Sequence, residues 1–177
     1  MAEAALVVID MQEASLVPCD GASDVIDRIN ELTGRAHSAG APVVFVQHED
    51  DEFVKGTHGW RLAAQLDRQP DATIVEKRYR DGFADTRLAE VLRGRGARRI
   101  VVTGAHSDLC VLTTALSALA HGFDLTFVAD GHIAMPAELP GGTLPAASVE
   151  ELVNARFATL RYPGRVVEVV PAADVRF

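Results

Sequence analysis

Short, continuously apolar runs that alternate with helical patterns are the feature that most constrains the fold of this 177-residue chain. Six such runs recur and predict strands at residues 5–9, 42–46, 73–75, 99–103, 125–128 and 166–169. Their apolar residues are mostly continuous, whereas a strand with one solvent-exposed face alternates apolar and polar residues. Continuous runs are typical of a parallel sheet that is covered on both faces.

Helical spacing of apolar residues fills the gaps between these runs. Residues 24–38 carry Val25, Ile26, Ile29, Leu32 and Ala36 at that spacing, with Ser23 as the expected N-cap and Gly40 as the expected stop. Residues 85–93, 111–120 and 146–160 show similar patterns. We therefore expect one domain over residues 1–177: a three-layer, doubly wound, Rossmann-like α/β fold with a mostly parallel six-stranded sheet.

The amino-acid composition limits which classes of protein this chain can belong to. A hydrophobic content of 48% is enough for one sizeable core, and a net charge of −8 argues against a nucleic-acid-binding surface. The sequence shows no basic leader and no apolar run of about 20 residues, so we expect no membrane segment. Its two cysteines, Cys19 and Cys110, stand in different contexts and do not suggest a disulfide framework. We expect a soluble, cytoplasmic protein.

Polar residues stand at the ends of three predicted strands. Asp10 follows the first strand, Lys77 follows the third, and Cys110 lies where the fourth gives way to a helix. The carboxyl ends of parallel strands border the cleft in which such folds bind ligands. Taken singly, each residue has another explanation: Asp10 as a helix cap, Lys77 as a solvated lysine, and Cys110 as inert packing.

Together these three residues form a coherent catalytic set. Cys110 would be the nucleophile, Asp10 would accept and return a proton, and Lys77 would balance the local charge. A free thiol with a pKa near ~8.5 is only slightly ionised at neutral pH, so an ammonium group and a helix N-terminus would help to activate it.

Five motifs, spread over nearly the whole chain, carry a resemblance to a known family. They are Val-Val-Ile-Asp-Met-Gln at 7–12, Glu-Lys-Arg-Tyr-Arg-Asp-Gly-Phe at 76–83, Gly-Ala-His-Ser-Asp-Leu-Cys-Val at 104–111, Gly-Phe-Asp-Leu-Thr-Phe-Val-Ala-Asp-Gly at 122–131, and Val-Val-Pro-Ala-Ala-Asp-Val at 169–175. The chain resembles the isochorismatase-like cysteine hydrolases, which include nicotinamidases and N-carbamoyl amide hydrolases. The resemblance implies the fold expected above.

The resemblance also implies roles for individual residues. It implies a catalytic triad of Asp10, Lys77 and Cys110, and a cis peptide bond between Ala105 and His106. It further implies an oxyanion hole made by the backbone N–H groups of His106 and Cys110.

The substrate is less well indicated by the resemblance. We expect the substrate-binding residues to be Gln12, Trp60, Phe83, His106 and Val111. The family often shows Ser-Ala-Phe where this chain has Asp81, Gly82 and Phe83, so no particular substrate is implied.

The segment after the second predicted strand could hold a metal site. Nicotinamidases of this family carry an Asp-x-His element and further histidines at this place. Residues 47–52 here read Gln-His-Glu-Asp-Asp-Glu, and His58 follows. His48, His58 and the nearby carboxylates could bind a metal, but the family spacing is absent, and a solvated acidic loop is the simpler interpretation. We expect no metal and no other cofactor, and nicotinamide is not a favoured substrate.

The function expected from these features is cysteine-dependent hydrolysis of an amide or ureido C–N bond in a small molecule, through a thioester. The family suggests a homodimer or a higher homo-oligomer. Two alternatives stay open: vinyl-ether hydrolysis of the isochorismate kind, which does not need a nucleophilic cysteine, and a catalytically silent binding domain with this fold. A nucleotide-binding protein is disfavoured because both glycine-rich phosphate motifs are missing, and a redox protein because Cys110 has no partner at C-x-x-C spacing.

Overall fold

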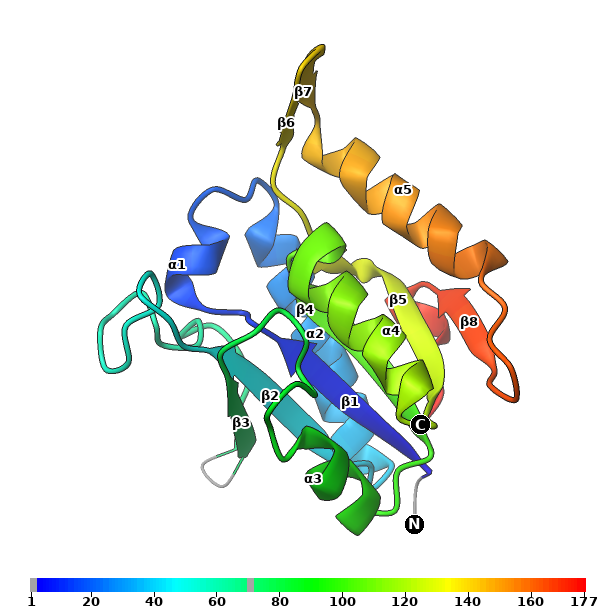
Figure 1. Cartoon of the computed structure of the whole chain (residues 1–177). Coiled ribbons are helices and arrows are strands. Elements are labelled where there is room, and N and C mark those ends of the chain that lie inside the picture. Colours follow the sequence, from blue (N-terminus) through cyan, green and yellow to red (C-terminus); the bar gives the residue numbers. More distant parts are fainter. Residues whose placement is uncertain (1–2, 70–71) are drawn as a thin grey trace.

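A single sheet of six parallel strands forms the centre of the computed structural model, which describes residues 3–69 and 72–177 (Figure 1). The strand order is β3-β2-β1-β4-β5-β8. The bounds are β1 (Ala4–Ile9), β2 (Val43–His48), β3 (Thr73–Lys77), β4 (Arg99–Ala105), β5 (Asp124–Ile133) and β8 (Val167–Val170). Every pair of neighbours in this sheet is parallel. The predicted doubly wound α/β fold is confirmed.

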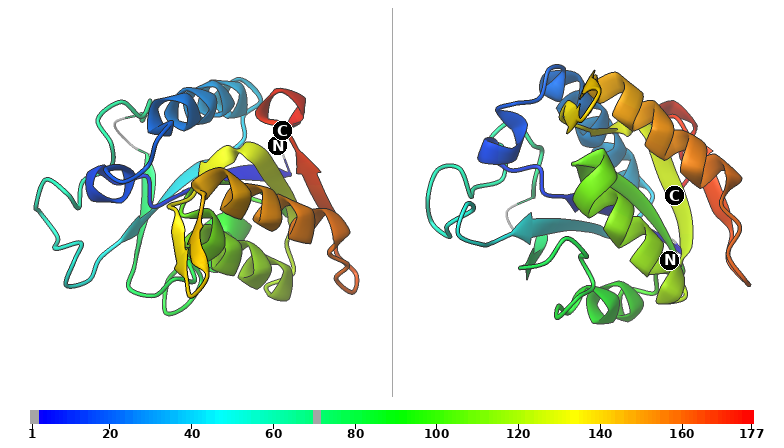
Figure 2. Two further views of the ribbon diagram at one scale, coloured as in Figure 1. Left: turned by 90° about the horizontal axis from the view of Figure 1, so that it is seen from above. Right: turned by 45° about the horizontal axis from the view of Figure 1, so that its top comes forward.

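Helices cover both faces of the sheet, which explains the continuous apolar runs (Figure 2). Helix α2 (Ala22–Ser38) packs on one face, and α3 (Leu88–Gly94), α4 (Leu112–Ala120) and α5 (Ala146–Thr159) pack on the other. Within β1, Leu6 and Val8 join the core beneath α2, while Val7 and Ile9 join the core on the opposite face. Alternate residues therefore point to different layers, and all of them are buried.

Two local features near the N-terminus differ from the sequence prediction. Helix α2 begins at Ala22 after Gly21, whose φ is 81°, so the expected cap Ser23 lies inside the first turn. A single turn, α1 (Glu13–Leu16), is too short to show a helical period and was not predicted.

The Pro- and Gly-rich stretch at 131–145 carries regular structure. It holds the end of β5 and a small hairpin of β6 (Ala137–Leu139) and β7 (Gly142–Leu144). Residues 49–59, which follow β2, contain no helix or strand. Among the described residues, no helix has the length and apolar character needed to cross a membrane.

The order of strands reverses between β1 and β4. From β1 the chain moves outward to β2 and β3, then returns to the other side for β4, β5 and β8. In open α/β sheets, ligands bind at the carboxyl ends of the strands at such a reversal.

Gly104 allows the close approach of β4 to β1 at this point. It is paired with Ile9, its φ is 125°, and a Cβ placed on it would lie 2.1 Å from the Ile9 carbonyl oxygen. Any side chain at this position would push apart the two strands that hold Asp10 and the segment before Cys110.

Gly104→Ala is therefore expected to lower the free energy of unfolding by about 3 kcal/mol or more, because of both the clash and the positive φ. Gly34→Ala is the matched control, since Gly34 lies in α2 with open space around its Cβ position. That control should leave stability unchanged or raise it by up to about 1 kcal/mol. Urea unfolding of the two variants tests the difference, and equal stabilities would contradict the role given to Gly104.

Candidate active site

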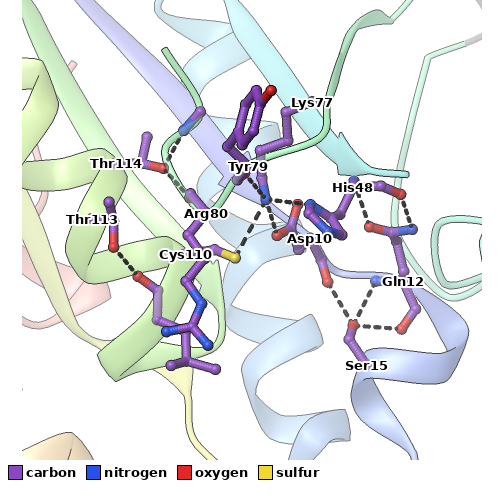
Figure 3. Close-up of polar contacts among 12 residues, drawn as sticks. Asp10, Gln12, Ser15, His48, Lys77, Tyr79, Arg80, Cys110, Thr113 and Thr114 are labelled. Carbon is purple, nitrogen blue, oxygen red and sulfur yellow. Dashed lines mark hydrogen bonds and ion pairs between the residues drawn. The ribbon is translucent and has the colours of Figure 1, made fainter. Parts of the chain in front are cut away.

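Three side chains meet at the carboxyl edge of the sheet (Figure 3). Asp10 directly follows β1, Lys77 is the last residue of β3, and Cys110 lies in η1, a π-helical turn (Ser107–Val111) between β4 and α4. The Lys77 ammonium Nζ lies 2.7 Å from Asp10 Oδ2 and 3.3 Å from Cys110 Sγ. Residues separated by up to 100 positions in sequence thus share one polar cluster, as parallel strand ends permit.

Asp10 occupies a sharp turn that buries its carboxylate. Its φ is 48°, its N–H donates to the Val46 carbonyl at 2.9 Å, and its carbonyl accepts from the Ser15 hydroxyl at 2.6 Å. Among the described residues, Asp10 Oδ1 has no hydrogen-bond partner although it is buried. A buried carboxylate oxygen without a donor is costly, so this atom is available to accept a proton from a neighbour.

Lys77 is a buried cation, with a side chain that is 0% exposed. Besides Asp10 and Cys110, its ammonium contacts His48 Nδ1 at 2.9 Å and donates to the Tyr79 carbonyl at 3.1 Å. The charge is thus matched by one carboxylate, and the remaining N–H groups have polar acceptors, as a buried ammonium requires.

Cys110 is half-buried, and its surroundings favour the neutral thiol. Burial is the largest influence and raises the pKa of the thiol to about 12; the negative charge of Asp10 adds to this, while Lys77 opposes it. The expectation that the ammonium and the helix N-terminus would favour a resting thiolate is therefore outweighed by burial and Asp10.

The thiol opens on a hollow of about 310 Å³. The residues that line it are Asp10, Ala14, Ser15, Pro18, His48, Asp50, Glu52, Phe53, Arg80, Ala105, His106, Leu109, Cys110 and Met135. A larger hollow of about 670 Å³ lies at the amino ends of β2 and β3, next to Gly40 and Arg95. None of the three clustered residues reaches that hollow, so the smaller one is the candidate active site.

His106 borders the hollow through both backbone and side chain. The peptide bond between Ala105 and His106 is cis. The His106 ring Nε2 lies 2.8 Å from the Ser15 carbonyl, which can only accept, so Nε2 donates. This contact joins the segment after β4 to the segment after β1.

A second histidine, His132, to which the sequence pattern assigns no role, forms hydrogen bonds that connect η1 to α5. His132 Nε2 lies 3.0 Å from Asn154 Oδ1 on α5, and His132 Nδ1 lies 2.7 Å from the Ser107 hydroxyl. Burial lowers the pKa of His132, which favours the neutral ring that can donate to Asn154 and accept from Ser107. The turn that carries Cys110 is thereby tied to β5 and α5.

Four residues expected to bind substrate are not among those that line the hollow. Gln12 is fully buried, and its amide donates to the carbonyls of His48 and Trp60. Phe83 and Val111 belong to the hydrophobic core. Trp60 borders a different hollow, beside β3. Of the five residues expected to bind substrate, only His106 faces the thiol's hollow.

Charged residues that sequence reasoning did not place here also line the hollow: Asp50, Glu52 and Arg80. The sequence pattern indicates His48 only as part of a possible metal site or an acidic loop. A polar residue at the end of β2 was the signal that could have placed it beside Asp10 and Lys77. Among residues 3–69 and 72–177, no three His, Cys, Asp or Glu side chains are grouped to hold a metal ion.

Comparison with known proteins gives consistent matches. The model of the isochorismatase domain matches residues 4–154. A streptothricin hydrolase from Streptomyces noursei is 35% identical over 181 residues, covering 98% of this chain and 70% of the relative. A ureidoacrylate amidohydrolase from Pseudomonas syringae pv. syringae (strain B728a) is 30% identical over 167 residues, covering 71% of this chain and 66% of the relative. The chain therefore spans only part of the length of these curated relatives.

The fold has a near counterpart among solved structures. The crystal structure of an isochorismatase from Pseudomonas putida KT2440 superposes with a TM-score of 0.88 at 25% identity, covering 98% of this chain and 90% of that one. The resemblance read from the motifs agrees with the match of the domain over residues 4–154 and with the strand order of the sheet. The chain belongs to the isochorismatase family.

Proposed function

We propose that this chain hydrolyses a C–N bond of a small amide or ureido compound, with Cys110 as nucleophile and a thioester as intermediate. The observation that carries the proposal is the cluster itself: Cys110 Sγ lies 3.3 Å from Lys77, which is paired with Asp10 beside an accessible hollow. The names of the two curated relatives, a streptothricin hydrolase and a ureidoacrylate amidohydrolase, support a hydrolase of this class.

In the first step Asp10 acts as general base. Its unpartnered Oδ1 takes the proton of the Cys110 thiol as the sulfur forms a bond to the carbonyl carbon of the substrate. A thiol with a pKa of about 12 needs this coupled transfer, because it is almost wholly protonated at neutral pH. Lys77 supplies a fixed positive charge beside the sulfur as negative charge develops on it.

The carbonyl oxygen becomes negatively charged as the bond to sulfur forms. The backbone N–H groups of His106 and Cys110 are the proposed donors to this oxygen, and such a donor typically contributes about 3 to 4 kcal/mol to lowering the barrier. The C–N bond then breaks, and Asp10 returns its proton to the departing nitrogen. Ammonia or an amine leaves, and the acyl group stays on Cys110.

In hydrolysis of the thioester, water is the nucleophile and the Cys110 sulfur is the leaving group. Asp10 takes a proton from water, the hydroxyl bonds to the thioester carbon, and the C–S bond breaks. The released thiolate regains the proton from Asp10, and the product is a carboxylic or carbamic acid. Cys110, Asp10 and water account for every bond and every proton transfer in these reaction steps. The steps therefore need no metal and no cofactor.

We further propose that the protein works in the cytoplasm as a homodimer or a higher homo-oligomer, on a small-molecule substrate. Neither cysteine forms a disulfide, which fits a reducing compartment. The size of the hollow, about 310 Å³, fits a small ligand.

Cys110→Ala is expected to lower the release of ammonia or amine by at least about a thousandfold, because nothing else in the cluster can form the thioester. The measurement is turnover of a panel of amides and ureido acids by the whole chain. Cys19→Ala is the matched control, since Cys19 is a buried cysteine outside the hollow, and it should retain activity. Activity of Cys110→Ala within tenfold of the natural protein would reject the nucleophile.

The same pair of variants separates the two remaining functions. Vinyl-ether hydrolysis that survives Cys110→Ala would favour a reaction of the isochorismate kind. Binding of panel compounds without turnover by the natural protein would favour a silent binding domain.

Reactivity of Cys110 with iodoacetamide should increase steadily with pH. The thiol is the form favoured by burial, so the thiolate fraction is small below pH 9 and grows toward a pKa of about 12. The alkylation rate of the peptide that contains Cys110, followed by mass spectrometry, should therefore rise about tenfold per pH unit from pH 7 to pH 10 without a plateau. A plateau already present at pH 7 would show a resting thiolate and remove the need for Asp10 as base.

A further inference from the structure

His48 joins the catalytic cluster but has no part in the steps above. It is the last residue of β2, and its side chain is 13% exposed. Its ring Nδ1 lies 2.9 Å from the Lys77 ammonium, and its Nε2 lies 2.8 Å from Asp50 Oδ2. Figure 3 shows the ring directed at the Lys77 ammonium from the side opposite Cys110.

The hydrogen bonds of Asp50 determine which ring nitrogen carries the proton. Asp50 Oδ1 accepts the backbone N–H groups of Glu52 and Phe53, each at 2.8 Å. Partial burial opposes ionisation of Asp50, but these hydrogen bonds and the contact with His48 lower its pKa below the ordinary 3.8. Asp50 Oδ2 is therefore a carboxylate acceptor, His48 Nε2 carries the hydrogen, and His48 Nδ1 presents a lone pair to Lys77.

The ammonium of Lys77 has three N–H groups and, within the part of the chain that the structure describes, three oxygen or nitrogen acceptors. These acceptors are Asp10 Oδ2 at 2.7 Å, His48 Nδ1 at 2.9 Å and the Tyr79 carbonyl at 3.1 Å. Cys110 Sγ, at 3.3 Å, is a fourth and longer contact. Three acceptors on different strands or segments define the orientation of the ammonium, and the sulfur experiences its charge without being its main hydrogen-bond partner.

A neutral acceptor has an advantage over a second carboxylate at this place. The charge of Asp10 already raises the pKa of the Cys110 thiol, and another negative group beside Lys77 would raise it further. His48 satisfies one N–H of the ammonium without adding negative charge near the sulfur.

We propose that His48, oriented by Asp50, is a positioning residue that accepts one N–H of Lys77 and so holds the ammonium against both Asp10 and Cys110. Its consequence for turnover rests on the function proposed above. The contact itself can be tested on the thiol alone, without any substrate.

Two substitutions of His48 differ in where they place a polar atom. In His48→Asn the side-chain oxygen can occupy the place of Nδ1 and accept from Lys77. In His48→Gln the polar atoms lie one bond farther out, near the place of Nε2, so Lys77 loses its acceptor. His58→Gln, at an exposed histidine in the stretch of residues 49–59 that follows β2, is the matched control.

The readout is the rate at which iodoacetamide alkylates Cys110 at pH 9 in the full chain. His48→Gln should lower this rate about fivefold or more, the scale of one hydrogen bond, whereas His48→Asn should stay within about twofold of the natural protein. His58→Gln should leave the rate unchanged. Equal rates for the Asn and Gln variants, or an unchanged rate for His48→Gln, would overturn the proposal.

Thermal unfolding shows whether His48→Gln folds. If that variant does not fold, a variant of Asp50 provides a second test of the proposal. In Asp50→Asn the amide oxygen can keep the N–H groups of Glu52 and Phe53, so the NH₂ group faces His48 Nε2. The ring must then accept at Nε2 and carry its hydrogen on Nδ1, which faces the N–H groups of Lys77. The alkylation rate should again fall about fivefold or more, and an unchanged rate would contradict the role given to the His48 tautomer.

These outcomes are distinct from failure of the proposed function. If the alkylation rates follow the prediction but no amide is hydrolysed, His48 positions Lys77 and the reaction has been assigned wrongly. If amides are hydrolysed through Cys110 but the rates ignore His48, the reaction stands and the positioning role is wrong.

Discussion

The buried ion pair between Lys77 and Asp10 is the interaction on which the site depends. An ammonium with no exposed surface requires both a counter-charge and hydrogen-bond acceptors, and removal of one partner from such a pair typically costs about 3 to 5 kcal/mol. Here the partners come from the ends of β1 and β3, with β2 between them. The pair can form only when these three strands are in register, so the site exists only in the assembled sheet.

Burial, more than the pair, determines the state of Cys110. A lone ammonium would favour a thiolate, but burial and the charge of Asp10 together raise the pKa of the thiol to about 12. The cluster therefore holds a thiol and a carboxylate, each in contact with the ammonium of Lys77. In the mechanism proposed above, this arrangement generates the nucleophile only during attack, when a substrate carbonyl is present to bond to the sulfur.

Much of this arrangement could be predicted from the sequence. Continuous apolar runs predicted the parallel sheet, and polar residues at the ends of those runs predicted which side chains would meet. Side-chain direction could not be predicted in the same way: Gln12, Phe83 and Val111 lie within or next to the motifs, yet their side chains point into the protein. His48 was missed because β2 continues two residues beyond the apolar run and carries it to the edge of the sheet. The cap at Gly21 and the hairpin of β6 and β7 depend on positive-φ glycines and on local pairing, which a periodic pattern does not reveal.

The central claim is that an acyl group is carried on Cys110 during turnover. The most direct measurement is acid quenching of the enzyme while it turns over an amide substrate, followed by intact mass and peptide mapping. The account predicts a mass increase equal to the acyl part of the substrate, located on the peptide that contains Cys110 and removed by hydroxylamine. Rapid turnover under the same conditions with no adduct on Cys110, or with the adduct on another residue, would contradict it.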